Sequence, residues 1–532
     1  MMDERLLHYP YPSSRRVIMG RRGAVATSQP LAALAGMEML LAGGSAVDAA
    51  VAMAVCLTVV EPTSNGIGGD AFAIVWDGKL HGLNASGMSP RALTPELFPE
   101  VSKIPPRGWL SVTVPGAVSA WRALWERWGK LPFEKLFEPA IRYAEEGFPV
   151  SPETARAWKR AEEIYLKLEG PEFVAFKEVF FPEGRAPRAG EVWRSPLHAT
   201  TLREIAVTGG ESFYAGRLAE KIAAFAADTG GLLTREDLAA HRAEWVKPIM
   251  TTYRDFEVWE LPPNGQGIAA LIALNILEGF ELDRIPRESA ESYHLLIEAT
   301  KLALADTRRF VADPRFMEVA VEQLLDKRYA AERRGLIGEK AIPLVEPGLS
   351  PGGTVYLAAA DGELMVSFIQ SNYMGFGAGI LVPGTGIALQ NRGAGFVLEK
   401  GHPNRVGPQK RPFHTIIPGF LTKDRKPIGP FGVMGGPMQP QGHVQVVVNL
   451  VDYKMNPQAA LDAPRWHFVE GREVLLEHSV SRDIAVALSD RGHEVRVVAE
   501  GGVFGRGQLI VRSGRVLIAA SEPRADGLAL AW

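Results

Sequence analysis

The stretch 352–370 constrains the fold of this 532-residue chain more than any other part of it. It begins Gly352-Gly353-Thr354-Val355-Tyr356, and the apolar run over 354–360 predicts a strand. Asp361-Gly362 then predicts a tight turn, and 364–370 predicts the returning strand. We therefore expect a central hairpin whose open end carries Thr354.

The Gly353–Thr354 peptide bond is a candidate for self-cleavage. If this bond breaks, Thr354 becomes a new N-terminus that carries its nucleophile and its base in one residue. The hydroxyl attacks, and the α-amine, with an ordinary pKa of about 7.7–8.0, accepts the proton near neutral pH. This is the chemistry of N-terminal-nucleophile hydrolases. Taken alone, however, the Gly-Gly-Thr triplet favours a plain turn that enters a strand.

The segments that follow the hairpin favour the cleavage interpretation. They are Gly375-Phe376-Gly377-Ala378-Gly379-Ile380, Pro383-Gly384-Thr385-Gly386-Ile387-Ala388-Leu389 and Gln390-Asn391-Arg392. In order and spacing they resemble the small-subunit core of the γ-glutamyltransferase family, also called glutathione hydrolases, which mature by autocleavage before a threonine. Further matches in the same order are Gly66-Ile67-Gly68-Gly69, Val114-Pro115-Gly116, Lys410-Arg411-Pro412, Gly435-Gly436, Val447-Val448-Asn449 and Ala463-Pro464-Arg465. None of these motifs is specific alone, but their shared order is.

Composition is that of an ordinary globular enzyme, with a formal net charge of −3. This charge gives no reason to expect nucleic acid or an anionic membrane as a partner. The resemblance implies a small-molecule amide substrate instead. The apolar stretch 46–60 contains Asp48 and is too short to span a bilayer, which predicts a buried helix. The only cysteine, Cys56, excludes an intrachain disulfide. Since no secretory signal is visible, we expect a cytoplasmic protein.

Local patterns predict an N-terminal part that begins helix, helix, strand. The first helix covers 30–41, and Ser45 with Asp48 forms a capping-box pattern for the second. A strand follows over 71–76, and the charge-rich region 117–240 predicts an outer layer of helices. Later predicted elements are a hairpin of 414–421 with 428–433, a helix over 442–453, and closing strands at 494–498, 508–511 and 515–519.

The resemblance implies an α/β fold, a four-layer αββα sandwich of the N-terminal-nucleophile hydrolase type. Residues 1–353 would form the large subunit of a proenzyme and 354–532 the small catalytic subunit, together one domain. The two fragments would stay associated as a heterodimer, with further dimerisation left open. The alternative is a doubly wound fold with a dinucleotide site. It is disfavoured because the glycine run from Gly375 has Ile380 where Gly-x-Gly-x-x-Gly requires a glycine.

The resemblance also implies an oxyanion site and a mechanism without cofactors. In the family two consecutive glycine amides hold the oxyanion, and Gly435-Gly436 match them between a predicted strand and a predicted helix. Ser371 and Asn372, at the end of the returning strand, are candidates to contact the Thr354 hydroxyl or the substrate.

We expect no metal, because the histidines lack metal-ligand spacing. The three considered are His414, His443 and His467.

The sequence departs from the family at its substrate anchors. Ser86 stands where an arginine holds the γ-glutamyl α-carboxylate, and Gly395 stands where an aspartate holds the α-amine. The family's serine pair is replaced by His414-Thr415. We therefore consider Arg392, His414 and Thr415 as binding residues for a different carboxylate, although Arg392 is equally consistent with a structural or surface role.

These departures leave the substrate open. The chain resembles the divergent, acylase-like branch of the family more than the glutathione-degrading one. We expect an autoprocessed amidohydrolase or acyltransferase that cleaves γ-glutamyl or related acyl amides through an acyl-threonine. One alternative is an acylase acting on non-glutamyl amides, such as glutaryl or oxamate-like compounds. Another is a non-catalytic relative that binds small molecules.

Overall fold

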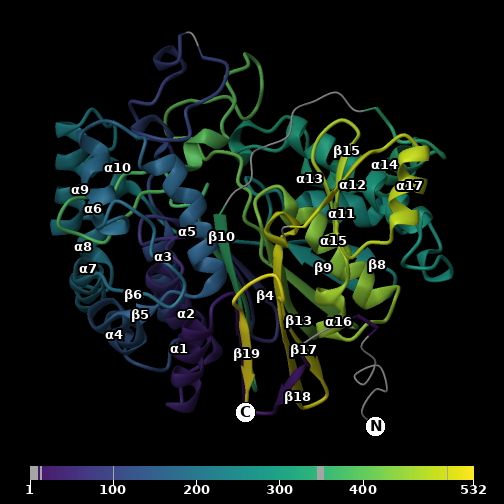
Figure 1. Ribbon diagram of the computed structural model, residues 1–532, viewed down its shortest axis with the longest axis horizontal. Coiled ribbons are helices and arrows are strands. Elements are labelled where there is room, and N and C mark those ends of the chain that lie inside the picture. The colour runs from purple at the N-terminus through teal and green to yellow at the C-terminus, as the bar shows by residue number, and fades with distance from the viewer. Residues whose placement is uncertain (1–9, 12–14, 100, 344–352, 500) are drawn as a thin grey trace.

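Two seven-stranded antiparallel sheets stack face to face in the centre of the molecule (Figure 1). The computed structural model describes residues 10–11, 15–99, 101–343, 353–499 and 501–532. One sheet has the order β19 (Leu528–Ala531), β2 (Gly23–Thr27), β10 (Gly353–Asp361), β11 (Met365–Tyr373), β3 (Asp70–Trp76), β4 (Leu80–Asn84) and β7 (Glu244–Val246). The other has the order β1 (Ile18–Gly20), β18 (Val516–Ser521), β17 (Arg506–Ser513), β13 (Lys426–Met434), β12 (Gly419–Lys423), β9 (Phe256–Glu260) and β8 (Ile249–Tyr253).

Helices cover the outer faces of both sheets, which confirms the expected four-layer αββα arrangement (Figure 1). The layer over the β10 sheet contains α1 (Pro30–Leu41), α2 (Ala46–Val60), α3 (Ala117–Trp128), α4 (Glu138–Glu146), α5 (Pro152–Tyr165), α6 (Val174–Phe180), α7 (Pro196–Val207), α8 (Glu211–Tyr214), α9 (Arg217–Asp228) and α10 (Arg235–Ala240). The opposite layer contains α11 (Gly267–Leu277), α12 (Ala290–Phe310), α13 (Val321–Leu324), α14 (Lys327–Arg334), α15 (Met438–Val451), α16 (Pro457–Asp462) and α17 (Arg482–Asp490).

The predicted central hairpin is strands β10 and β11, which pair in the middle of their sheet. Every residue of β11 is buried, because α2 covers one face of the hairpin and β13 the other. A strand covered on both faces has an apolar run rather than an alternating pattern, as seen here. At the turn, the Asp361 carboxylate accepts hydrogen bonds from the Glu363 and Leu364 amides, each 2.7 Å long. Its other oxygen accepts the Ala46 amide at the start of α2, so the turn and the helix fix each other.

Both sheets mix strands from before and after residue 353. Strands β2 and β3 flank the β10–β11 hairpin, and β9 pairs with β12. The sheet hydrogen bonds therefore run across the predicted division of the chain. A cut at this point would leave two segments held by two shared sheets. The existence of separate subunits stays a prediction.

Several predicted elements are confirmed, and others are corrected. Helices α1 and α2 begin and end close to the expected residues, and Ser45 and Asp48 form the capping box. Strand β12 begins only at Gly419, because Pro418 cannot donate a ladder hydrogen bond. Helix α15 begins at Met438, four residues before the predicted start, since a proline is tolerated in the first turn.

The predicted closing strand at 494–498 belongs elsewhere. It is β16 (Glu494–Val498), which pairs in parallel with β15 (Glu473–Glu477). With β14 (Trp466–Phe468) these strands form a separate three-stranded sheet beside the sandwich. A second small sheet joins β5 (Phe148–Pro149) to β6 (Val192–Trp193).

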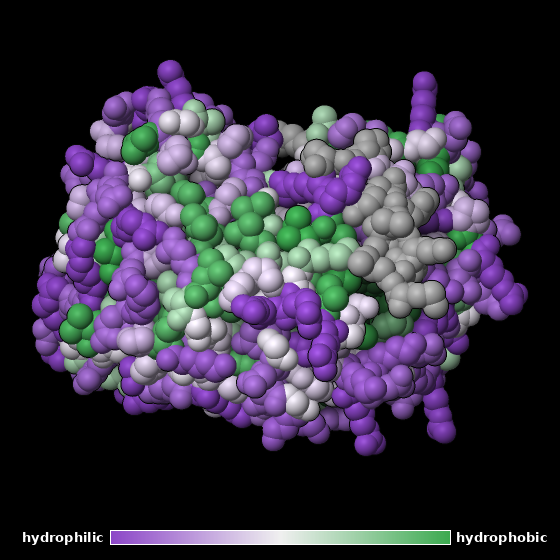
Figure 2. Space-filling view, turned by 90° about the horizontal axis from the view of Figure 1, so that it is seen from below, coloured by the Kyte–Doolittle hydropathy of each residue, from purple (hydrophilic) through white to green (hydrophobic). Residues whose placement is uncertain are grey.

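The surface seen from below has hydrophobic residues gathered in a band across its middle, with hydrophilic residues around them (Figure 2). Among the described helices, none combines the length and the apolar character needed to cross a bilayer.

Candidate active site

Thr354 lies near the start of β10, at the end of the hairpin opposite the Asp361 turn. The pairing of β10 with β11 is irregular here, because the register shifts between Gly353 and Val355. An irregularity of this kind leaves one residue out of the ladder and redirects its side chain, and such irregularities are frequent next to active sites. Thr354 is nevertheless buried, with only 3% of its surface exposed.

Two side chains from other elements contact the Thr354 hydroxyl. The Ser371 Oγ lies 3.2 Å from the Thr354 Oγ1, and the Gln439 Nε2 donates to the same oxygen at 3.4 Å. Ser371 is itself held by the Tyr373 amide, which donates to its Oγ at 2.7 Å. Tyr373 has φ +77°, a left-handed conformation that is costly for a tyrosine and typical of functional sites.

Thr354 and Gly435 line the same cavity, which has a volume of about 740 Å³. Three arginines also line it: Arg107, Arg160 and Arg506. Most of the remaining wall is apolar and includes Ala157, Ala161, Ile164, Met374, Met434, Val469, Leu475 and Val503. The cavity thus combines a hydroxyl, a backbone turn and an apolar wall with cations, a composition that suits a small organic acid or its amide.

Gly435 and Gly436 connect β13 to α15, as the sequence predicted. Their φ angles are +137° and +59°, so both occupy backbone conformations that favour glycine. Within the described part of the chain, neither amide donates a hydrogen bond. The Gln266 side chain holds the turn from behind by donating to the Gly436 carbonyl at 2.9 Å. The turn therefore presents two free N–H groups, although their use as an oxyanion site stays a prediction.

Ser371 and Asn372 are neighbours in the sequence but point to different places. Ser371 faces Thr354, whereas the Asn372 Nδ2 donates to the Phe376 carbonyl at 3.3 Å. A Cβ added to Gly69 would lie 2.8 Å from the Asn372 Oδ1, so this side chain packs against the glycine-rich loop. The two side chains point to opposite sides because they are consecutive residues of strand β11.

Arg392, His414 and Thr415 lie together in a buried polar cluster, but they do not belong to the described residues that line the cavity. The Arg392 Nη1 donates to the Thr415 Oγ1 at 2.8 Å, and its guanidinium lies 4.0 Å from the centre of the Tyr373 ring. Arg392 is 1% exposed, which excludes the surface role considered above. Its Nη2 has no hydrogen-bond partner among the described residues. Gln266 connects the cluster to the glycine turn by donating also to the Thr415 carbonyl.

Asp70 completes this cluster and was missed by the sequence analysis. Its Oδ2 lies 3.1 Å from the His414 Nε2, and its Oδ1 accepts the amides of Gly87 and Gly116. Burial raises the pKa of Asp70 to about 7, against the opposing effect of Arg392. Burial and the Arg392 charge lower the pKa of His414 well below its ordinary value. The signal for Asp70 was its place directly after Gly68-Gly69, at the start of a predicted strand.

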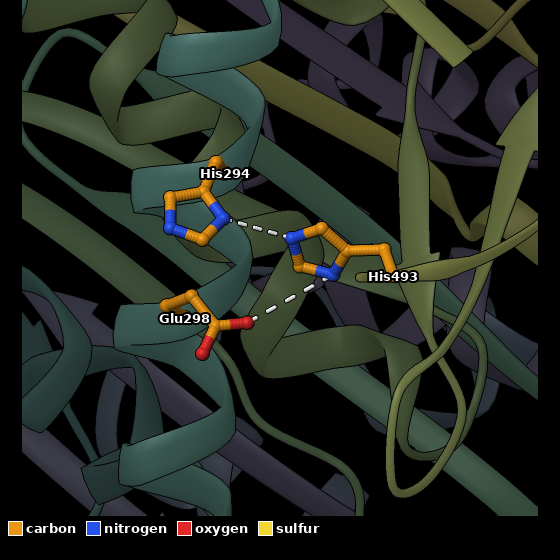
Figure 3. Close-up of side chains that lie close together, drawn as sticks. All are labelled: His294, Glu298 and His493. Carbon is orange, nitrogen blue, oxygen red and sulfur yellow. Dashed lines mark hydrogen bonds and ion pairs between the residues drawn. The ribbon is translucent and has the colours of Figure 1, made fainter. Parts of the chain in front are cut away.

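One group of described residues is close enough to hold a metal ion, namely His294, Glu298 and His493 (Figure 3). The His294 Nδ1 and His493 Nε2 lie 2.8 Å apart. However, the buried Lys301 ammonium donates to the Glu298 Oε1 at 2.8 Å and already balances that charge. A divalent ion would lie beside this ammonium, so we interpret the group as a structural polar cluster. The histidines considered in the sequence are apart: His414 pairs with Asp70, His443 with Glu260, and His467 lines the cavity.

Comparisons with known proteins agree with this arrangement. The family described as Gamma-glutamyltranspeptidase matches residues 32–532. The glutathione hydrolase-like YwrD proenzyme of Bacillus subtilis (strain 168) is 37% identical, over 96% of this chain and 99% of that protein. The oxamate amidohydrolase proenzyme of Klebsiella pneumoniae is 34% identical, over 96% and 98%. The crystal structure of cephalosporin acylase from Bacillus halodurans superposes with a TM-score of 0.95 at 55% identity, covering 100% of this chain and 99% of that one. The chain belongs to the gamma-glutamyltranspeptidase family.

Proposed function

We propose that this protein is a self-cleaving amide hydrolase and acyl transferase with Thr354 as its nucleophile. The observation that carries the proposal is the cavity that Thr354 shares with Gly435, the first residue of the glycine turn. A hydroxyl beside two free amides is the arrangement that acyl transfer requires, because the amides stabilise the charge that develops on the carbonyl oxygen.

Maturation uses the same hydroxyl. The Thr354 Oγ attacks the Gly353 carbonyl carbon, the C–N bond breaks, and the Gly353 acyl group moves to the oxygen as an ester. Water then hydrolyses the ester and leaves a free α-amine on Thr354. The fragments 1–353 and 354–532 stay associated as a heterodimer, because both sheets contain strands from each.

In turnover the free α-amine of Thr354 takes the hydroxyl proton while the oxygen attacks the substrate amide. The oxyanion accepts hydrogen bonds from the Gly435 and Gly436 amides. The leaving amine takes the proton, and the acyl-Thr354 ester then passes to water or to a second amine. The reaction needs no group beyond those of the chain.

The preferred acyl group carries a carboxylate but no required α-amine, as in a glutaryl amide. The support is that, among the described residues, the Arg392 Nη2 has no partner, in a cluster that Gln266 links to the glycine turn, whereas no charge stands at the two γ-glutamyl anchors. Ser86 is fully buried, and its Oγ donates to the Asn84 Oδ1 at 2.7 Å. At Gly395 an added Cβ would lie 2.9 Å from the Phe413 carbonyl oxygen, so an aspartate would not fit without backbone movement. Hydrolysis of γ-glutamyl amides is the second candidate, which family membership supports.

Hydrolysis of matched 4-nitroanilides by the purified protein tests this function. We expect a glutaryl anilide to be cleaved at least as fast as a γ-glutamyl anilide, and a butyryl anilide to be cleaved poorly. Arg392→Gln should raise KM for the glutaryl compound roughly 10- to 100-fold, as expected for a lost charge-assisted hydrogen bond, with little change for butyryl. A strong preference for γ-glutamyl would favour the second candidate. A single full-length band after long incubation, with no turnover, would favour a non-catalytic binding protein.

A further inference from the structure

Gln439 is a fully buried side chain in the first turn of α15, and it contacts the Thr354 hydroxyl. Its backbone amide donates to the Gly436 carbonyl at 3.2 Å, so it is fixed to the glycine turn. Its side chain reaches across to the start of β10. The contact joins the proposed nucleophile to the proposed oxyanion turn.

The orientation of the Gln439 amide is determined by a second contact. The Ile417 backbone N–H donates to the Gln439 Oε1 at 3.0 Å, and an N–H can only point at an acceptor. The oxygen of the side-chain amide therefore faces Ile417. The NH₂ group then faces Thr354, where it can only donate.

We propose that Gln439 is a catalytic donor that stabilises the Thr354 oxygen when this oxygen leaves an ester. The inference rests on the proposed function, since it requires Thr354 to be the nucleophile. A neutral amide accepts no proton, so Gln439 is not a base. Its contribution depends on the charge on the oxygen that it contacts.

That charge differs between the two halves of the reaction. When Thr354 attacks an amide, the charge that its oxygen gains as the proton moves to the α-amine passes into the new C–O bond, so a donor gives little help. When water attacks the acyl-Thr354 ester, the C–Oγ bond breaks and Oγ leaves with the electron pair. It then takes the proton that the α-amine removed from water, and the carboxylic acid is released. A hydrogen bond that is stronger to a developing alkoxide than to an ester oxygen accelerates this second half.

The same argument applies to maturation. The ester formed between Gly353 and Thr354 is also hydrolysed with Oγ as the leaving group. Loss of the donor should therefore slow two ester hydrolyses and neither of the preceding attacks. This selectivity distinguishes a catalytic donor from a residue that only supports the fold.

The test compares Gln439→Met, which removes the donor at similar length, with Gln439→Glu, which keeps an acceptor for the Ile417 N–H. Gln441→Met is the matched control, because Gln441 is a buried glutamine of the same helix that donates to the Pro437 and Phe468 carbonyls. Glutaryl-4-nitroanilide is the probe. Release of 4-nitroaniline is followed before the steady state. The mass of the small fragment is measured by mass spectrometry after an acid quench.

We expect both Gln439 variants to release the first equivalent of 4-nitroaniline at the normal rate and then to turn over about 10- to 100-fold more slowly. The small fragment should accumulate one glutaryl group. In Gln439→Glu the added carboxylate should also shift the acid limb of the pH profile of turnover to higher pH, because it favours the protonated α-amine of Thr354. The Gln441→Met control should behave as the wild type.

If a Gln439 variant remains uncut, hydroxylamine should cleave its precursor at residue 353, because hydroxylamine attacks esters. Precursor that resists hydroxylamine would overturn the inference, as would slow turnover without an accumulated acyl group or unchanged turnover in both variants. Failure of the proposed function itself looks different. In that case the wild type would never show an acyl group on Thr354.

Discussion

The two ends of the β10–β11 hairpin are built in opposite ways. At the turn, the Asp361 carboxylate accepts three backbone amides, two from the turn and one from α2. At the open end the strand register shifts, and among the described residues the Thr354 hydroxyl has only side-chain contacts, both longer than 3.1 Å. A positive φ at Tyr373 adds backbone strain beside it.

The Asp361 end of the hairpin is built for stability, and the Thr354 end is built for the proposed chemistry. At the turn end both carboxylate oxygens of Asp361 accept backbone amides, from the turn itself and from α2, as in a structural site. At the Thr354 end, within the described part of the chain, the Gly435 and Gly436 amides donate no hydrogen bond and the Arg392 Nη2 has no partner. Unpaired buried groups are costly, and they persist where a substrate is expected to pair with them.

Replacing Thr354, the proposed nucleophile, should have the largest effect. Thr354→Ala should leave a folded, uncut chain with turnover reduced about 10⁴-fold or more, because no other group supplies the attacking oxygen. N-terminal sequencing of the small fragment of the wild type should begin Thr-Val-Tyr-Leu. A fragment with a different start would remove Thr354 from the proposed role.

Blocking the glycine turn should have the next largest effect. Gly436→Val should lower kcat about 10²- to 10³-fold, since a side chain would displace the carbonyl oxygen from the amides. The positive φ of +59° also predicts some loss of stability. Gly43→Val is the control, because Gly43 has φ +87° with no atom within 4 Å of an added Cβ. Equal kcat values in the two variants would place the oxyanion site elsewhere.

The buried Asp70 carboxyl should make the free energy of unfolding depend on pH. Burial raises the pKa of Asp70 from 3.8 to about 7, so the folded state holds a proton that the unfolded state releases. The contribution of the Asp70 proton to the free energy of unfolding is complete below pH 3.8 and is lost as the pH rises to about 7. In urea unfolding, the free energy of unfolding of the wild type minus that of Asp70→Asn should fall by about 4 kcal/mol over this range. A difference that grows with pH would mean that the Asp70 pKa is lowered instead.

The smallest effect is expected from a substitution at the Asp361 turn, and it should change only the free energy of unfolding. Asp361→Ala should lower the free energy of unfolding by about 2 kcal/mol, because three backbone amides lose their acceptor. kcat/KM should stay within about twofold, since the turn lies at the opposite end of the strands from Thr354. Thermal or urea unfolding together with steady-state kinetics measures both quantities. A large loss of kcat/KM without loss of stability would contradict the separation of the two ends.

Much of the fold followed from local patterns. Continuous apolar character over 354–360 and the Asp361-Gly362 turn predicted the hairpin, and Ser45 with Asp48 predicted the start of α2. These predictions held because short-range hydrogen bonding and burial act in the same direction there. The strand at 494–498 was predicted in type but placed in the wrong sheet, since strand pairing depends on distant partners.

Among the site residues, those in local motifs were predicted from the sequence, and those that depend on long-range contacts were not. Thr354, Gly435 and Gly436 were named from their place in a motif, and the structure places Thr354 and Gly435 on one cavity. Asn372 points away from Thr354, and Asp70, Gln266 and Gln439 were missed. Their contacts join segments more than 80 residues apart, and no local pattern records such contacts.

The sequence by itself determined the elements, the candidate nucleophile and the absence of the γ-glutamyl anchors, because each depends on residue identity or on neighbours a few positions away. Only the tertiary structure decided which polar groups are free. Within the part of the chain that the structure describes, packing buries Arg392 without a partner for its Nη2 and leaves the Gly435 and Gly436 amides without acceptors, while it gives all the polar atoms of Asp361 a partner. Whether a buried polar group is satisfied depends on chain segments that meet only in the folded molecule.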